Sequence, residues 1–302
     1  MTKTLIILNP NAAGGKAGTV WTDLEPLLWE RLGELVVAIT QHPEEVAEHL
    51  DKAYASGLTR VIAIGGDGTN HSLINALAHL NARNPDGPPM IYGNLPVGTG
   101  RDWARGAGIP FRDIHAAARW IAEATPKPVD IGAVNYDGQQ RFFLNIASAG
   151  ISGEVAQRIN RDPQRRSWTF LQATIATMLR YRPQAVRIAL DGAAWYNGAA
   201  YLLAVANGTT FGRGMKIAPQ AKTNDGLFDV VLVKGMSRPR ILMAFEQVYR
   251  GVHLNHPKVN YRQAREVRIE SQIPMSFELD GEMFGGHDLA FSIRPGLLQM
   301  LI

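Results

Sequence analysis

The sequence of 302 residues contains no cysteine. Disulfides, thiolate metal sites and a cysteine nucleophile are therefore excluded, and the composition fits a reducing compartment such as the cytoplasm. Long apolar runs are also missing, since the longest one, Ala199 to Ala206, is far shorter than the ~20 residues of a membrane-spanning helix. The run Leu5–Leu8 ends at Asn9-Pro10, before it reaches the ~7–15 apolar residues of a secretory signal. We therefore expect neither a membrane span nor a signal peptide.

Apolar residues make up 46% of the chain, which is the globular range. A chain of this length buries roughly 75% of its unfolded surface, enough for one large core or two medium ones. Lys and Arg number 31 against 27 Asp and Glu, a formal net charge of +4. This excess favours an anionic partner, which leaves a phosphate compound, an acidic membrane surface and nucleic acid open.

The first part of the chain alternates short apolar runs with helical periodicity. The periodic apolar residues include Val20, Leu24 and Leu28, and later Leu73 and Leu77. This alternation predicts a Rossmann-like parallel sheet with helices on both faces. The expected strands are Thr4–Leu8, Leu35–Ile39, Arg60–Ile64 and Met90–Leu95.

After Pro126 the pattern becomes mostly β, punctuated by Asp-Gly and Asn-Gly turn pairs. It predicts a β sandwich interrupted by two helices, at Ser167–Arg180 and Pro239–Arg250. We expect an α/β domain at 1–125, a β-rich domain at 126–289, and a final strand at 290–302 that can pair in either domain. The strands expected in this half are Val129–Asn135, Arg141–Ile146, Ala185–Leu190, Ala199–Ala206, Leu227–Val233, Val267–Glu270 and Met275–Leu279.

Several well-known site patterns are absent. Gly15-Lys16 lacks the upstream glycine and the following hydroxyl residue of a P-loop, and Trp103 stands where a dinucleotide fingerprint needs glycine. The sequence has no His-Glu-x-x-His zinc motif and no Gly-x-Ser-x-Gly nucleophile motif.

Glycine-rich loops follow the predicted strands instead. In Gly65-Gly66-Asp67-Gly68-Thr69, the glycines leave backbone N–H groups accessible to a phosphate chain, and a helix begins at the same point. Asp67 would repel that phosphate unless a cation such as Mg²⁺ lay between them. The alternative is a tight turn in which Asp67 only caps the helix.

The loop after Leu95 repeats this design, with Gly98-Thr99-Gly100 followed by Asp102. Here the alternative is a helix capped by Asp102. A third loop, Asn9 to Gly15, follows the first strand.

These motifs, in this order, resemble the catalytic family of diacylglycerol kinases in its bacterial soluble lipid-kinase branch, related to sphingosine and ceramide kinases. The resemblance covers essentially the whole chain and includes Asn224-Asp225-Gly226-Leu227 and Leu279-Asp280-Gly281-Glu282. It implies an ATP-dependent lipid kinase with its active site in a cleft between two domains. The residues implied to line the nucleotide are Asn9, Pro10, Asn11, Ala12, Ala13, Thr40, Gly65, Gly66, Asp67, Gly68, Thr69, Asn70, His71 and Thr99.

The resemblance also implies roles for acidic residues. Glu282 matches the proposed general base, and Asp67, Asp102 and Asp130 match an aspartate network around water and Mg²⁺. A second, structural metal is implied at Lys222, Asp225 and Leu227.

One position departs from the family. Arg101 stands where family members usually have asparagine, so the role of that asparagine is not carried over. From sequence alone, Asp280-Gly281-Glu282 and Asp225-Gly226 also fit plain turns.

At the lipid end, Arg158, Arg161, Arg165 and Arg166 precede a helix with Trp168, Phe170, Leu171, Ile175 and Met178. This pattern fits transient docking of a cytoplasmic enzyme on an anionic bilayer, or else a solvated face beside a core stripe. The alternative functions are an NAD kinase-like activity on a soluble nucleotide and a non-catalytic lipid- or nucleotide-binding regulator. No nucleic-acid recognition motif is present, so we expect no nucleic-acid partner. The sequence leaves open whether the protein forms a homodimer, and it does not specify the acceptor lipid.

Overall fold

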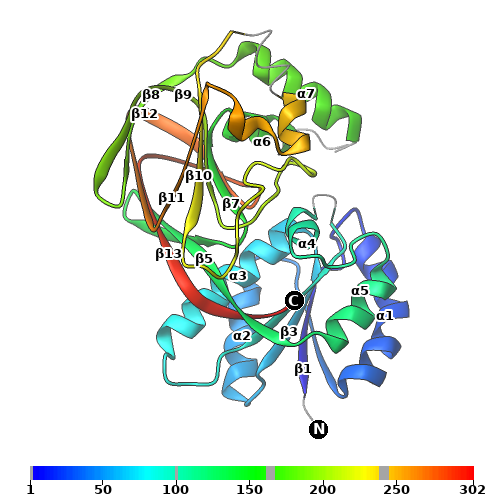
Figure 1. Cartoon of the computed structure of the whole chain (residues 1–302). Coiled ribbons are helices and arrows are strands. Elements are labelled where there is room, and N and C mark those ends of the chain that lie inside the picture. The colour runs from blue at the N-terminus through cyan, green and yellow to red at the C-terminus, as the bar shows by residue number, and fades with distance from the viewer. Residues whose placement is uncertain (1–2, 99–100, 161–166, 238–244) are drawn as a thin grey trace. The chain divides into compact units, whose positions relative to one another are not determined.

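The computed structural model of the chain describes residues 3–98, 101–160, 167–237 and 245–302. The chain forms two compact units (Figure 1). Unit 1 comprises Met1–Ile131 and Pro295–Ile302, and unit 2 comprises Gly132–Arg294. The chain leaves unit 1 within strand β5 (Pro126–Tyr136) and returns to it within strand β13 (Glu282–Leu301).

Unit 1 contains a parallel sheet, as the sequence predicts. Its strands are β1 (Thr4–Leu8), β2 (Leu35–Ile39), β3 (Arg60–Gly65) and β4 (Ile91–Pro96), in the spatial order β4-β3-β1-β2. The end of β13 adds a further parallel pairing beside β4. The central strands are apolar along nearly their whole length because both of their faces are buried.

Helices cover this sheet. Helix α1 (Lys16–Leu32) packs with α5 (Ile114–Glu123), and α2 (Glu45–Ala55) packs with α3 (Asp67–Arg83). Figure 1 shows these two pairs on opposite sides of the strands, which confirms the predicted layering. The short helix α4 (Asp102–Gly106) follows the β4 loop.

Unit 2 is rich in antiparallel strands, as predicted. Long strands β9 (Ala193–Ala206) and β12 (Glu266–Leu279) each pair with β8 (Gln184–Leu190) through one half and with β7 (Ile146–Gly150) through the other. One apolar cluster fills the space inside these strands, and a second, on the opposite side of β9, includes Ile151 of α6 and Met178 of α7. The elements wholly within unit 2 are β6 (Gln139–Phe143), β7 (Ile146–Gly150), α6 (Ile151–Asn160), α7 (Ser167–Arg180), β8 (Gln184–Leu190), β9 (Ala193–Ala206), β10 (Phe228–Lys234), η1 (His253–Asn255), β11 (Val259–Ala264) and β12 (Glu266–Leu279).

The prediction of one strand at Arg141–Ile146 is wrong. The segment is divided between β6 and β7, and the break at Leu144–Asn145 arises because these backbone amides bond to the Asp280 carboxylate instead of to a strand. Two other predicted strands, Val267–Glu270 and Met275–Leu279, are parts of β12, with an irregularity between Glu270 and Met275.

Other elements were missed or misjudged in length. Helices α5 and α6 and strand β11 were not predicted, and the final strand begins at Glu282 instead of Ala290. Of the helix predicted at Pro239–Arg250, residues 245–250 are helical and 238–244 lie outside the described residues. Among the described helices, none has the length and apolar character needed to cross a bilayer.

Candidate functional site

The turn from β3 into α3 is built on two glycines. A Cβ on Gly65 would lie 2.6 Å from the Thr69 Oγ1 atom, so the turn leaves no room for a side chain there. Gly66 is the N-cap of α3, and as a glycine it has no side chain with which to cap the helix. The start of an α-helix carries the positive end of the helix dipole, so this end of α3 suits an anion. Asp67 is the first residue of the helix.

The loop after β4 lies directly against this turn. A Cβ on Gly98 would lie only 2.8 Å from the Cα atom of Gly66, and the Val97 N–H donates to the Gly65 carbonyl at 3.1 Å. The two loops thus meet backbone to backbone, as the carboxyl ends of neighbouring parallel strands allow.

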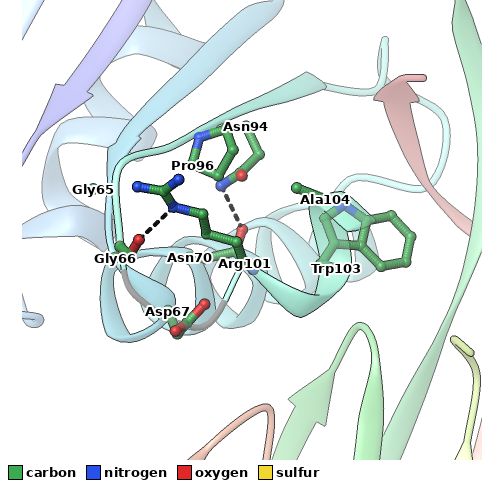
Figure 2. Close-up of a pocket in the computed structure, with 10 residues that line it drawn as sticks. Gly65, Gly66, Asp67, Asn70, Asn94, Pro96, Arg101, Trp103 and Ala104 are labelled. Carbon is green, nitrogen blue, oxygen red and sulfur yellow. Dashed lines mark hydrogen bonds between the residues drawn. The ribbon is translucent and has the colours of Figure 1, made fainter. Parts of the chain in front are cut away.

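A pocket lies where these loops meet (Figure 2). One side comes from the β3–α3 turn and the other from the end of β4 and the start of α4. The lining residues are Gly65, Gly66, Asp67, Asn70, Asn94, Pro96, Gly98, Arg101, Trp103 and Ala104.

A buried polar network supports one wall of the pocket. The Asn70 Oδ1 atom accepts a hydrogen bond from Asn94 Nδ2 at 3.1 Å and another from the Tyr92 hydroxyl. These bonds fix the Asn70 side chain (Figure 2). Sequence reasoning missed Asn94, although a polar residue within the apolar strand Ile91–Pro96 was a usable signal.

Four of the residues predicted to contact the nucleotide line this pocket: Gly65, Gly66, Asp67 and Asn70. Nine of the others do not line the pocket, and Thr99 is outside the described residues. Those not in the lining are Asn9, Pro10, Asn11, Ala12, Ala13, Thr40, Gly68, Thr69 and His71.

Several of these outer residues hold the loops together. Asn9 Nδ2 donates to Thr69 Oγ1 at 3.3 Å, which connects the first loop to α3. The first loop itself ends in three consecutive positive φ angles, at Ala13, Gly14 and Gly15. The Thr40 N–H donates to the Leu8 carbonyl at 2.9 Å, and the buried side chain of His71 contacts Asn75.

The three aspartates of the predicted Mg²⁺ network have different surroundings. Asp67 lines the pocket, Asp102 pairs with Arg105 at 2.5 Å, and buried Asp130 accepts the Gly296 N–H at 2.7 Å. In the described parts of the chain, no three acidic or histidine side chains are grouped as a metal site. Mg²⁺ is often held by one or two carboxylates together with substrate phosphates, so Asp67 beside accessible backbone amides fits this mode.

The predicted structural metal set lies in unit 2. The Asp225 Oδ1 atom accepts the Leu227 N–H at 3.1 Å, and both Lys222 and Asp225 are exposed. Burial raises the pKa of nearby Asp229, whose carboxylate accepts a hydrogen bond from Tyr261 at 2.5 Å. The metal assignment at this turn stays a prediction.

The predicted base, Glu282, follows a turn that is held firmly. Asp280 and Gly281 both have positive φ, of 51° and 93°. The Asp280 carboxylate accepts N–H groups of Leu144, Asn145 and Ile146 at 2.7, 2.9 and 3.0 Å. Glu282 is partly buried and pairs across the turn with Leu279. Sequence analysis did not assign this anchoring role to Asp280.

Comparison with known proteins identifies the family. Residues 3–134 match the diacylglycerol kinase catalytic domain, and residues 145–302 match the YegS C-terminal NAD kinase beta sandwich-like domain. A diacylglycerol kinase of Bacillus subtilis is 33% identical over 231 residues, which cover 75% of this chain and 71% of that protein. The chain belongs to the bacterial diacylglycerol kinase family. The resemblance inferred from the motifs is thus confirmed.

Two further comparisons cover nearly the full length of this family member. A diacylglycerol kinase of Mycobacterium tuberculosis is 28% identical over 302 residues, covering 99% of this chain and 94% of that protein. A crystal structure of a diacylglycerol kinase from Bacillus anthracis superposes with a TM-score of 0.73 at 22% identity, covering 99% of this chain and 96% of the other. The shared fold therefore extends over both units.

The predicted membrane-docking segment of this kinase-family chain is described only in part. Arg158 is exposed, whereas Arg161, Arg165 and Arg166 lie outside the described residues. The side chains of Trp168, Phe170 and Leu171 are also outside them. Met178, which was grouped with these apolar residues, is buried in the second apolar cluster of unit 2. That residue belongs to the core, and docking through the rest of the segment stays a prediction.

Proposed function

We propose that this chain is an ATP-dependent lipid kinase, which transfers the γ-phosphate of MgATP to the hydroxyl of a diacylglycerol-like lipid. The observation that supports this most strongly is the pocket at the two glycine-rich loops, in a chain of the diacylglycerol kinase family. The start of helix α3 at this pocket suits phosphate oxygens, and Asp67 suits a cation between carboxylate and phosphate.

In this proposal the protein contributes positioning and charge. The Gly65–Gly66 turn and the start of α3 would bind phosphate oxygens, and Asp67, with Asp102 and Asp130, would hold Mg²⁺ directly or through water. Bound Mg²⁺ would neutralise the phosphate charge that develops during transfer. The lipid oxygen forms a bond to the γ-phosphorus, the bond from that phosphorus to the bridging oxygen of ADP breaks, and Glu282 accepts the hydroxyl proton.

The remaining implied residues complete this proposal. We assign the loop from Asn9 to Ala13, Thr40 and Thr99 to the surroundings of the nucleotide. The turn at Lys222, Asp225 and Leu227 would hold a structural cation. Transient contact with an anionic membrane surface would bring the enzyme to its lipid, with the protein otherwise in the cytoplasm.

The test is incubation of the purified chain with γ-labelled ATP, Mg²⁺ and a total lipid extract, followed by identification of the labelled product. We expect label in an organic-soluble phospholipid, and a loss of about 100-fold or more in Asp67→Asn, since a charge-stabilising group is removed. A parallel reaction offers NAD in place of lipid. Label in NADP instead of lipid would assign the chain to a soluble acceptor, and no turnover with either would favour a non-catalytic regulator.

A further inference from the structure

Arg101 lines the pocket and has a backbone conformation that arginine rarely adopts. Its φ is 54°, in the left-handed region that asparagine and glycine adopt more readily than arginine. Such a conformation in a bulky residue persists only where its surroundings hold it. Here the conformation is held by hydrogen bonds of the Arg101 side chain itself.

Two backbone carbonyls fix the guanidinium group. Arg101 Nε donates to the Gly98 carbonyl at 2.6 Å, and Nη1 donates to the Phe111 carbonyl at 2.5 Å. Since Gly98 touches Gly66, these bonds keep the guanidinium at the junction of the two glycine-rich loops. Figure 2 shows the side chain extended across the pocket toward the Gly65–Gly66 turn.

Arg101 forms no ion pair with the described residues. Asp102, the next residue, pairs with Arg105 instead. Two of the five guanidinium N–H groups are used by the carbonyls, which are neutral acceptors. A partly buried cation with donors to spare therefore lines the same pocket as the first residue of α3.

We propose that Arg101 is a fixed phosphate ligand, which lets this pocket bind a polyphosphate with little help from a divalent cation. The inference rests on the proposed function and concerns the same pocket. A guanidinium binds phosphate oxygens through paired N–H donors, and one already held in place loses little freedom on binding. It also offsets the repulsion between Asp67 and a phosphate that carries no metal.

Asparagine is the informative substitution at this position. Arg101→Asn removes the charge and the two carbonyl bonds, and it suits the left-handed backbone better, which offsets part of the lost stability; thermal melting checks that the variant is folded. Arg101→Lys keeps the charge but lacks the planar pair of donors. Arg112→Asn is the matched control, because Arg112 lies in the same stretch of chain, is exposed and does not line the pocket.

The experiment is titration calorimetry of the full chain with three probes: MgATP, ATP in EDTA, and inorganic tripolyphosphate in EDTA. We expect the parent and Arg112→Asn to bind ATP in EDTA within about tenfold of MgATP. Arg101→Asn should bind both metal-free probes about 10- to 100-fold more weakly, the range expected for lost charge-assisted hydrogen bonds, with a smaller change for MgATP. The affinity of Arg101→Lys for the metal-free probes should lie between those of the parent and Arg101→Asn.

Equal or tighter metal-free binding by Arg101→Asn would overturn the inference, since Arg101 would then fill or block the pocket. In that case binding of MgATP by both proteins would leave the proposed function intact. If the parent itself binds ATP neither with Mg²⁺ nor without it, the proposed function fails first, and this inference fails with it.

Discussion

Gly98 is the residue at which the two glycine-rich loops come closest. A Cβ there would lie 2.8 Å from the Gly66 Cα atom, and backbone cannot move aside as a flexible side chain can. We therefore predict that Gly98→Ala destabilises unit 1 by about 1–3 kcal/mol, as overpacking usually does. It should also weaken ATP binding, because the loops that line the pocket must separate. Urea unfolding and ATP titration of the same variant measure both effects.

Gly285→Ala is the control for this prediction. The nearest atom to a Cβ on Gly285 is the Met275 carbonyl oxygen at 4.0 Å, an ordinary contact. This variant should unfold within about 1 kcal/mol of the parent. If Gly98→Ala behaves in the same way and binds ATP normally, the close contact of the loops does not shape the pocket.

Single residues of the pocket were predictable only where their signal was local. Gly65, Gly66 and Asp67 belong to one continuous motif at a strand end, and the structure places all three in the pocket lining. Arg101 was noticed as a departure from the family, but its bond to the Phe111 carbonyl, 10 residues away, depends on tertiary structure. Asn94 acquires its role from Asn70 on another element, a pairing that residue spacing does not contain.

Among the elements, three Asp-Gly turns offer a graded test of how a carboxylate fixes a turn. Asp137, Asp191 and Asp280 all have positive φ, at 45°, 49° and 51°. Asp280 accepts three backbone N–H groups and Asp191 accepts two, whereas among the described residues no N–H donates to Asp137. These turns therefore differ mainly in the bonds that their carboxylates make.

We predict that replacement of each aspartate by asparagine destabilises the protein in the order Asp280, Asp191, Asp137. Asparagine tolerates the same backbone conformation, so the change reports the lost charge. The Asp280→Asn loss should reach about 2 kcal/mol, a value typical of hydrogen bonds to a charged group. Urea unfolding of the three variants gives the order. An equal effect at Asp137 and Asp280 would mean that turn geometry, and not amide binding, determines their contribution.

The η1 segment gives unit 2 a dependence on pH. His253 is buried, and its Nε2–H donates to the Ile217 carbonyl at 3.0 Å. Burial lowers the pKa of His253, an effect that the bond to Ile217 only partly opposes. The unfolded chain therefore takes up a proton at about pH 6.5 while the folded chain does not, and the contribution of His253 to stability falls as the pH falls.

We predict that the free energy of unfolding decreases less for His253→Gln than for the parent between pH 7.5 and pH 5.5. Glutamine keeps a neutral donor but does not titrate. This variant therefore removes only the part of the unfolding free energy that depends on protonation of His253. Urea unfolding at both pH values measures the difference. Identical pH dependence in the two proteins would show that His253 takes up its proton equally in the folded and unfolded states.

At this scale the sequence was most informative where an element is a short, mainly apolar run. The four strands of unit 1 were located to within one residue at each end, although only β1, β3 and β4 are buried along nearly their whole length and β2 is largely exposed. The β6–β7 break was missed because its cause, Asp280, lies more than 130 residues further along the chain. Helix α5 was overlooked, although Asp113 caps it by accepting the His115 and Ala116 N–H groups.

For the whole molecule, the order of short motifs indicated the family, and the comparisons confirm it over both units. The order of the motifs can be compared with that of a family from sequence alone, because each loop must follow its own strand in the chain. The sequence does not identify the acceptor lipid in this way, since an apolar binding surface is formed by side chains from many elements. The same is true of membrane contact, for which net charge of +4 is only a weak indication.

The most direct test of the kinase proposal compares Glu282→Ala with the parent in a single assay of label transfer from γ-labelled ATP to lipid, with ATP binding measured on the same samples. We predict that the variant folds and binds MgATP like the parent but transfers phosphate at least about 100-fold more slowly, because the general base is missing. Near-parental transfer by Glu282→Ala would contradict the proposed mechanism.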